Sequence, residues 1–313
     1  MPAVKHKSSK KADAVLKSPV KKTKKTESPK VIKAETASVS KKDTVVKNAA
    51  EPRKGYYGFI DNIKKKWRQQ EKKSKGWKIG LRILRSFLLA AWVAAALFGS
   101  QYLVAGALII LNRLGVQFYD NATFETIISA IIYIVCLVVT IALPWLVLEE
   151  KTTRDELGLR GLLTWTDIGL AVVGFVLSLI VAFVLTGLLQ WLLPFVNWEQ
   201  KQEIGYENIA GTKDMLMAFL ALVVIAPIAE EIIFRGWLYG KLRLRISAIP
   251  AIILVSILFG VVHLQANVAV SVASMSVMMC LIREYTGTIW GGMLVHMLKN
   301  GLAYYLIFVY GIA

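Results

Sequence analysis

Three ionisable side chains lie at the end of an apolar stretch of this sequence. Residues 216–229 read LMAFLALVVIAPIA, and Glu230, Glu231 and Arg235 come next. Glu231 and Arg235 are four residues apart, so they can form an ion pair on one face of a helix. Glu230 is turned about 100° from Glu231 around such a helix, which leaves it free to face another partner. A carboxylate in that position is a candidate general base that takes a proton from water.

Two of the three histidines of the chain, His263 and His296, lie in later apolar segments. Asn300 follows His296 by four residues, so the two side chains can share a helix face and offer two hydrogen-bond donors. Donors fixed around a developing oxyanion in a low-dielectric site stabilise a transition state. At about 1.5 Å per helical residue, Glu230, His263 and His296 lie roughly 16, 21 and 14 Å from the nearest polar flanks. The three side chains are therefore expected at a common depth.

The segments that must position these side chains are long and apolar. A helix needs about 20 residues to cross roughly 30 Å of hydrocarbon. The series predicts an all-α fold, a polytopic transmembrane helix bundle of about seven spans. Ionisable side chains inside such spans normally face the protein interior and mark function. The candidate spans are residues 86–111, 126–149, 167–194, 214–240, 249–265, 268–282 and 287–312. The fifth and sixth are short and contain polar residues, so a broken helix or one buried in protein is the alternative for both.

The charge of the chain is concentrated before residue 80. The 313 residues are 56% hydrophobic and carry a formal net charge of +17. The first 80 residues hold 24 Lys and Arg against 7 Asp and Glu, which accounts for the whole excess. Residues 1–55 contain no aromatic side chain and are predicted to be a disordered Lys-rich tail. We expect this tail to contact anionic lipid headgroups rather than nucleic acid.

The rest of the chain divides into two further parts. Residues 56–85 mix apolar and basic side chains, which predicts an amphipathic juxtamembrane helix or a plain connector. Residues 86–313 are the expected transmembrane helical domain. Lys and Arg are most frequent in the connections 150–166 and 241–248, on the same side as the basic tail. The positive-inside rule then predicts an integral protein of the cell membrane with a cytoplasmic N-terminus.

Three short motifs follow one another along the chain, each in a different predicted span. AEEIIFRG at 229–236 contains EExxxR, FGVVH at 259–263 contains FxxxH, and HMLKN at 296–300 contains HxxxN. Together they resemble the CPBP family of intramembrane proteases, over roughly residues 160–312. That family includes the type II CAAX prenyl endopeptidases and bacteriocin-processing and immunity homologues. The resemblance implies an intramembrane endopeptidase that hydrolyses a membrane-embedded or lipidated peptide, such as a CAAX-type substrate.

The resemblance also implies roles for individual residues. Glu230 with His263 would activate the attacking water. His296 and Asn300 would hold the tetrahedral oxyanion.

The remaining motif residues, Glu231 and Arg235, would support the site. The family is often described as metalloproteases, and Glu230, His263 and His296 could bind zinc with one position open. The helical HExxH zinc signature is absent. We favour a glutamate mechanism without a cofactor and keep zinc as the alternative.

Two other classes of function are open at this point. A non-enzymatic immunity or scaffold membrane protein could keep the same fold, although binding alone does not need a water-activating pair. A proton-coupled transporter could use Glu and His side chains at mid-membrane as a relay. No internal repeat of the transporter kind is present, which counts against that class.

Overall fold

The computed structural model describes residues 77–119, 121–148, 151–200, 205–206, 209 and 211–311. Within these ranges every regular element is a helix, which confirms the all-α fold. The predicted disordered tail and residues 56–76 of the predicted amphipathic segment lie outside the described residues. The last part of that segment is helical and continues into the first span, because α2 begins at Trp77.

Six helical stretches are long and apolar enough to cross a membrane, and they correspond to six of the seven predicted spans. The predicted span 249–265 differs, because its helix α10 (Ala248–Val261) has only 14 residues. About 20 residues are needed for a full crossing. The six stretches are Ile79–Arg113, Ala122–Val147, Trp165–Leu192, Thr212–Arg243, Ala266–Thr286 and Trp290–Val309.

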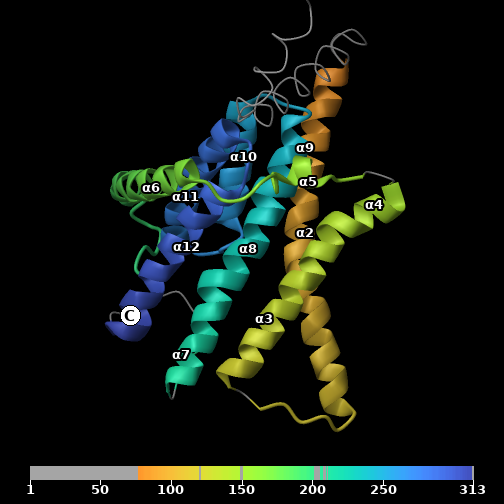
Figure 1. Cartoon of the computed structure of the whole chain (residues 1–313), viewed down its shortest axis with the longest axis vertical. Helices are drawn as coiled ribbons and strands as arrows, with labels where there is room; N and C mark the ends of the chain where they lie inside the picture. Colours follow the sequence, from red (N-terminus) through yellow and green to blue (C-terminus); the bar gives the residue numbers. More distant parts are fainter. Residues whose placement is uncertain are drawn as a thin grey trace, which may run out of the picture. The chain divides into compact units, whose positions relative to one another are not determined.

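Several of these stretches combine α-helical and π-helical segments. Figure 1 shows the Thr212–Arg243 stretch, with labels α7, α8 and α9, as one continuous helical column. π-helical segments are rare and occur often at functional sites. The elements are α2 (Trp77–Arg113), α3 (Ala122–Leu137), η1 (Val138–Ala142), α4 (Leu143–Leu148), α5 (Arg154–Leu157), α6 (Trp165–Leu192), α7 (Thr212–Phe219), η2 (Leu220–Ile225), α8 (Ala226–Glu231), η3 (Ile232–Leu238), α9 (Tyr239–Arg243), α10, α11 (Ala266–Thr286), α12 (Trp290–Tyr304) and η4 (Tyr305–Val309).

The helices that carry the motifs pack on one another. α11 contacts α6, α10 and α12, while α12 also contacts α8 and η2. α3 packs on α2, α7 and α8, so it reaches the same region from another side. The buried apolar core includes Phe234, Trp237, Phe259, Met279 and Val295. Many large apolar side chains of α2 and α6 face outward, as expected for helices that contact lipid.

Close approach of α10 and α11 depends on Gly260. A Cβ atom at this position would lie 2.8 Å from the backbone oxygen of Ala269 and 3.1 Å from the Cβ of Ala273. A backbone oxygen cannot move aside as a flexible side chain can. Gly260 precedes His263 by three residues, so the same contact fixes where α10 ends and where His263 lies.

We predict that Gly260→Ala lowers the apparent Tm of the detergent-purified protein by several degrees. Forcing an extra carbon into a packed contact costs about 1–3 kcal/mol. Gly106→Ala is the matched control, because a Cβ at Gly106 on α2 meets nothing within 4 Å. Thermal unfolding followed by intrinsic fluorescence measures both variants. Equal shifts in the two variants would contradict the packing role of Gly260.

Candidate functional site

A fully buried ion pair joins the last residue of α8 to η3. Glu231 and Arg235 are each 0% exposed, and Arg235 Nη1 donates a hydrogen bond to Glu231 Oε1 over 2.8 Å. The i,i+4 spacing predicted this pair. The guanidinium also lies over the ring of Phe259, with 4.3 Å between Arg235 Cζ and the ring centroid. The guanidinium of Arg235 thus faces the carboxylate of Glu231 on one side and the aromatic ring of Phe259 on another.

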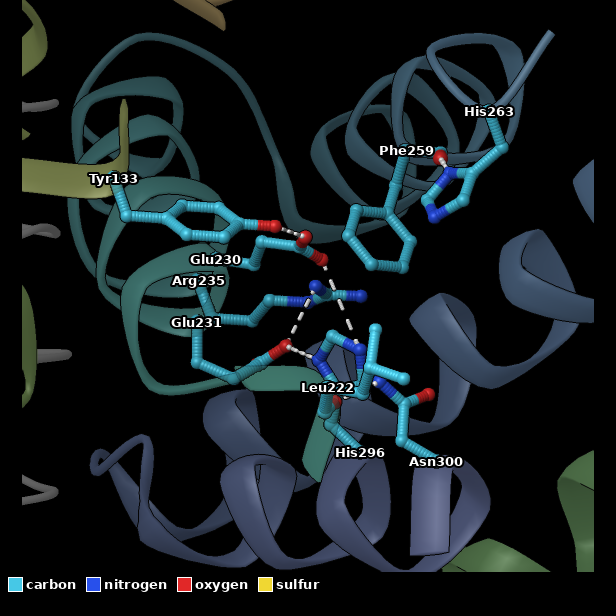
Figure 2. A network of polar contacts seen from close by, with 9 residues as sticks. All are labelled: Tyr133, Leu222, Glu230, Glu231, Arg235, Phe259, His263, His296 and Asn300. Atoms are coloured by element: carbon cyan, nitrogen blue, oxygen red, sulfur yellow. Dashed lines mark hydrogen bonds and ion pairs between the residues drawn. The ribbon is translucent and has the colours of Figure 1, made fainter. Parts of the chain in front are cut away.

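His296 on α12 lies between two carboxylates. Its Nδ1 is 3.1 Å from Glu231 Oε1, and its Nε2 is 3.7 Å from Glu230 Oε2 (Figure 2). The side chain is only 3% exposed. Gly292, four residues earlier on the same helix, allows this approach, because a Cβ there would lie 3.3 Å from Glu231 Oε2. The structure therefore brings Glu230, Glu231 and His296 together.

Tyr133 on α3 is a member of the site that sequence reasoning missed. Its hydroxyl donates a hydrogen bond to Glu230 Oε1 over 2.6 Å. The side chain of Glu230 is 15% exposed, so this bond is partly shielded from solvent. The available signal was a single hydroxyl inside the apolar run IIYIV at residues 131–135. That signal does not say whether the hydroxyl faces the protein or the membrane surface.

His263 lies just beyond the end of α10, beside Phe259. Its Nδ1 is 2.7 Å from the Phe259 carbonyl oxygen. A carbonyl can only accept, so Nδ1 carries the proton and Nε2 is left as an acceptor. Phe259 packs edge-on against both histidines, with centroid distances of 5.2 Å to His263 and 5.6 Å to His296. Figure 2 shows His263 across the Phe259 ring from the other residues; it interacts electrostatically with Glu230 and His296.

Asn300 binds the backbone of another span. Its Nδ2 donates to the carbonyl oxygen of Leu222 over 2.9 Å. In η2 the N–H of Ala226 bonds to the oxygen of Ala221, five residues back. In the same register Leu222 would receive the N–H of residue 227, which is Pro227 and has none. Asn300 therefore supplies the donor that the proline lacks, and its second amide hydrogen is left for another acceptor.

Lys299 lies next to Asn300 on α12 and is a further ionisable residue near the site. Its side chain is half-buried and interacts electrostatically with Glu230. No hydrogen bond or ion pair within the described ranges fixes its ammonium group. Lys299 is therefore an ionisable side chain near Glu230 that has no fixed contact among the described residues.

The alternative zinc site requires Glu230, His263 and His296 to converge. No group of three His, Cys, Asp or Glu side chains in the described part of the chain is placed to hold a metal ion. The two ring nitrogens of His296 face Glu231 and Glu230, and the Phe259 carbonyl holds Nδ1 of His263, which leaves Nε2 as the one ring nitrogen of His263 that could bind a metal. The residues as placed do not fit a three-ligand zinc site.

Comparison with known proteins points to one family. Residues 212–302 match the family model described as type II CAAX prenyl endopeptidase Rce1-like, a range that holds all three motifs. The chain is also 25% identical over 179 residues to the "Putative membrane peptidase YdiL" of Bacillus subtilis (strain 168). That alignment covers 55% of this chain and 68% of the relative. No solved structure matches the chain.

The family match and the apolar helices agree with the resemblance inferred from the three motifs. Six stretches can cross a membrane, and the matched range begins where the fourth of them begins. The chain is an integral membrane protein, and its residues 212–302 are similar to the Rce1-like type II CAAX prenyl endopeptidases, which supports the resemblance to the CPBP family of membrane proteases.

Proposed function

We propose that this protein is an intramembrane endopeptidase in which Glu230 activates the water that attacks a peptide bond. The observation that carries the proposal is the linked, buried set Tyr133, Glu230, His296, Glu231 and Arg235 within an apolar bundle. Buried charges are costly in such surroundings and are normally retained for function. The Rce1-like match over the same residues supports hydrolysis as that function.

The proposed reaction begins with transfer of a water proton to Glu230 as the water oxygen bonds to the scissile carbonyl carbon. Tyr133 fixes the carboxylate through Oε1, which leaves Oε2 directed toward the reacting water. His263 Nε2 is an acceptor and can bind the same water. The proton on Glu230 then passes to the leaving nitrogen as the carbon–nitrogen bond breaks.

The oxyanion of the tetrahedral intermediate needs hydrogen-bond donors close to Glu230. His296, when both ring nitrogens carry protons, donates Nδ1–H to Glu231 and presents Nε2–H to the site. The second amide hydrogen of Asn300 is the other donor in this proposal. Fixed donors of this kind account for a large part of catalysis in water-poor sites.

The substrate in this proposal is a membrane-embedded or lipidated peptide, with CAAX-type prenylated peptides as the first class to test. We place the protein in the cell membrane with a cytoplasmic N-terminus, on the distribution of Lys and Arg. The Lys-rich residues 1–55 would then contact anionic headgroups of the inner leaflet.

We predict that Glu230→Gln abolishes cleavage, with a rate loss of at least about 10³-fold. The amide is nearly the same size but cannot take a proton from water. Mass spectrometry of farnesylated CAAX peptides and their unprenylated counterparts in vesicles measures the cleavage. Glu199→Gln, in the connection after α6, is the matched control.

The Glu230→Gln protein must keep the elution profile and Tm of the wild type for the result to count. Full cleavage by this variant would refute the role of Glu230. A wild type that cleaves no membrane peptide yet confers protection unchanged by the substitution would favour the immunity or scaffold alternative.

We predict that Tyr133→Phe lowers kcat about tenfold and leaves KM unchanged, because the lost hydrogen bond orients the catalytic carboxylate. A hydrogen bond to a charged group contributes about 1.5–3 kcal/mol. Tyr102→Phe is the control, since Tyr102 on α2 is 77% exposed. A parallel rise in KM, or a Tm loss that accounts for the lower rate, would show that Tyr133 is structural only.

We predict that cleavage survives dialysis against EDTA and 1,10-phenanthroline, because the described residues do not form a three-ligand metal site. Activity is measured before and after dialysis, with a known zinc protease as the positive control. Loss of activity that returns on adding Zn²⁺ would overturn the glutamate mechanism.

A further inference from the structure

A pocket of about 650 Å³ lies among α2, α4, η3 and the residues after α9. It is separate from the polar network, since none of the motif residues lines it. Its walls are apolar and aromatic, and two arginines complete them. The lining residues are Arg85, Leu88, Leu89, Trp92, Leu143, Pro144, Val147, Trp237 and Arg245.

The charge of this pocket has one sign. Among the described residues that line it, Arg85 and Arg245 are the charged ones, and none is acidic. Arg85 is exposed, and no ion pair within the described ranges holds its guanidinium. Arg245 Nη1 donates to the Lys241 carbonyl oxygen over 2.9 Å, which helps to fix that guanidinium beside the pocket. Two guanidinium groups at one site suit a phosphate, which they can bind through paired hydrogen bonds.

Two indole N–H groups of the pocket have no acceptor. Nε1 of Trp92 and Nε1 of Trp237 are buried and unpaired within the described part of the chain. Trp237 is only 2% exposed, so bulk water does not satisfy it. An unsatisfied buried donor costs about 1–3 kcal/mol, which a ligand oxygen would recover. The pocket therefore offers neutral donors as well as positive charge.

The pocket lies where three membrane-crossing stretches begin or end. Those stretches begin at Ile79 and end at Val147 and Arg243 respectively, close to the lining residues Arg85, Val147 and Arg245. Phospholipid phosphates occupy this level of a bilayer, with the acyl chains beginning directly below. Apolar walls below a basic rim match that arrangement.

We infer that this pocket binds an anionic phospholipid. The phosphate lies between the guanidinium groups of Arg85 and Arg245, the ester oxygens accept from the tryptophans, and the first acyl segment packs on the apolar walls. Trp237 belongs to η3, two residues after Arg235, so the bound lipid braces the helix that carries the buried ion pair. This inference does not depend on the proposed hydrolytic activity.

The test is native mass spectrometry of the full-length protein titrated with phosphatidylglycerol. The wild type should retain one lipid tightly, and Arg85→Gln should weaken that binding about tenfold, since a charge-assisted hydrogen bond is lost. Trp92→Phe keeps an aromatic ring, removes one donor and should weaken it less. Arg82→Gln is the matched control on the same helix, outside the pocket, and should bind like the wild type.

Two further ligands distinguish binding of an anionic lipid from binding of free phosphate. Phosphatidylcholine should be retained more weakly than phosphatidylglycerol, and inorganic phosphate at millimolar concentration should not displace the lipid. Equal retention of both lipids, or equal loss in Arg85→Gln and Arg82→Gln, would overturn the inference. Displacement by phosphate alone would show an anion site without a lipid component and would also overturn it.

Discussion

The buried pair of Glu231 and Arg235 is the interaction on which the arrangement of this bundle depends. Removing two charges from water is costly, and their attraction repays that cost only when the geometry is good and other groups assist. Here His296 approaches the carboxylate, and the Phe259 ring covers the guanidinium. Nε and Nη2 of Arg235 and Oε2 of Glu231 make no hydrogen bond in the described structure. The ion pair therefore depends on the groups that the surrounding helices bring to it, His296 and Phe259, as well as on its own contact.

Shielding this pair brings three helical segments into close contact: the Thr212–Arg243 stretch, α10 and α12. Glycines make that contact possible, since Gly292 leaves room for Glu231 and Gly260 allows α10 to meet α11. Phe259 and His296 reach the pair from α10 and α12. Asn300 ties α12 to the carbonyl of Leu222. Glu230 then occupies the edge of the cluster, where it remains partly accessible.

Much of the fold and part of the site could be predicted from the sequence, because burying a charge is costly and few arrangements of the helices avoid that cost. Long apolar segments predicted the helical class, and the i,i+4 spacing predicted the contact between Glu231 and Arg235. Tyr133 could not be predicted, because one tyrosine in an apolar run fits both an interior position and a membrane interface. The contact of Asn300 with Leu222 also escaped prediction, since it depends on a π-helical register that apolar composition does not encode.

The short helix α10 is the clearest difference from the sequence-based expectation. A short apolar run with polar residues suggested a crossing over 249–265, but the helix ends at Val261. Leu264, in the turn that follows, has a positive φ of 61°. The turn directs the chain into α11 and leaves His263 outside the regular helix. The residues of this connection read VHLQ, so two polar side chains, His263 and Gln265, follow directly where the apolar helix ends.

Both partners of the ion pair lie on one helical stretch, and this affects how the chain can be inserted into the membrane. The stretch Thr212–Arg243 is synthesised well before His296 and Asn300 exist. Two opposite charges one helical turn apart can neutralise each other within that single segment, so it need not enter the bilayer with a bare charge. The later helix then adds His296 to an ion pair that has already formed, so insertion and assembly become separable steps.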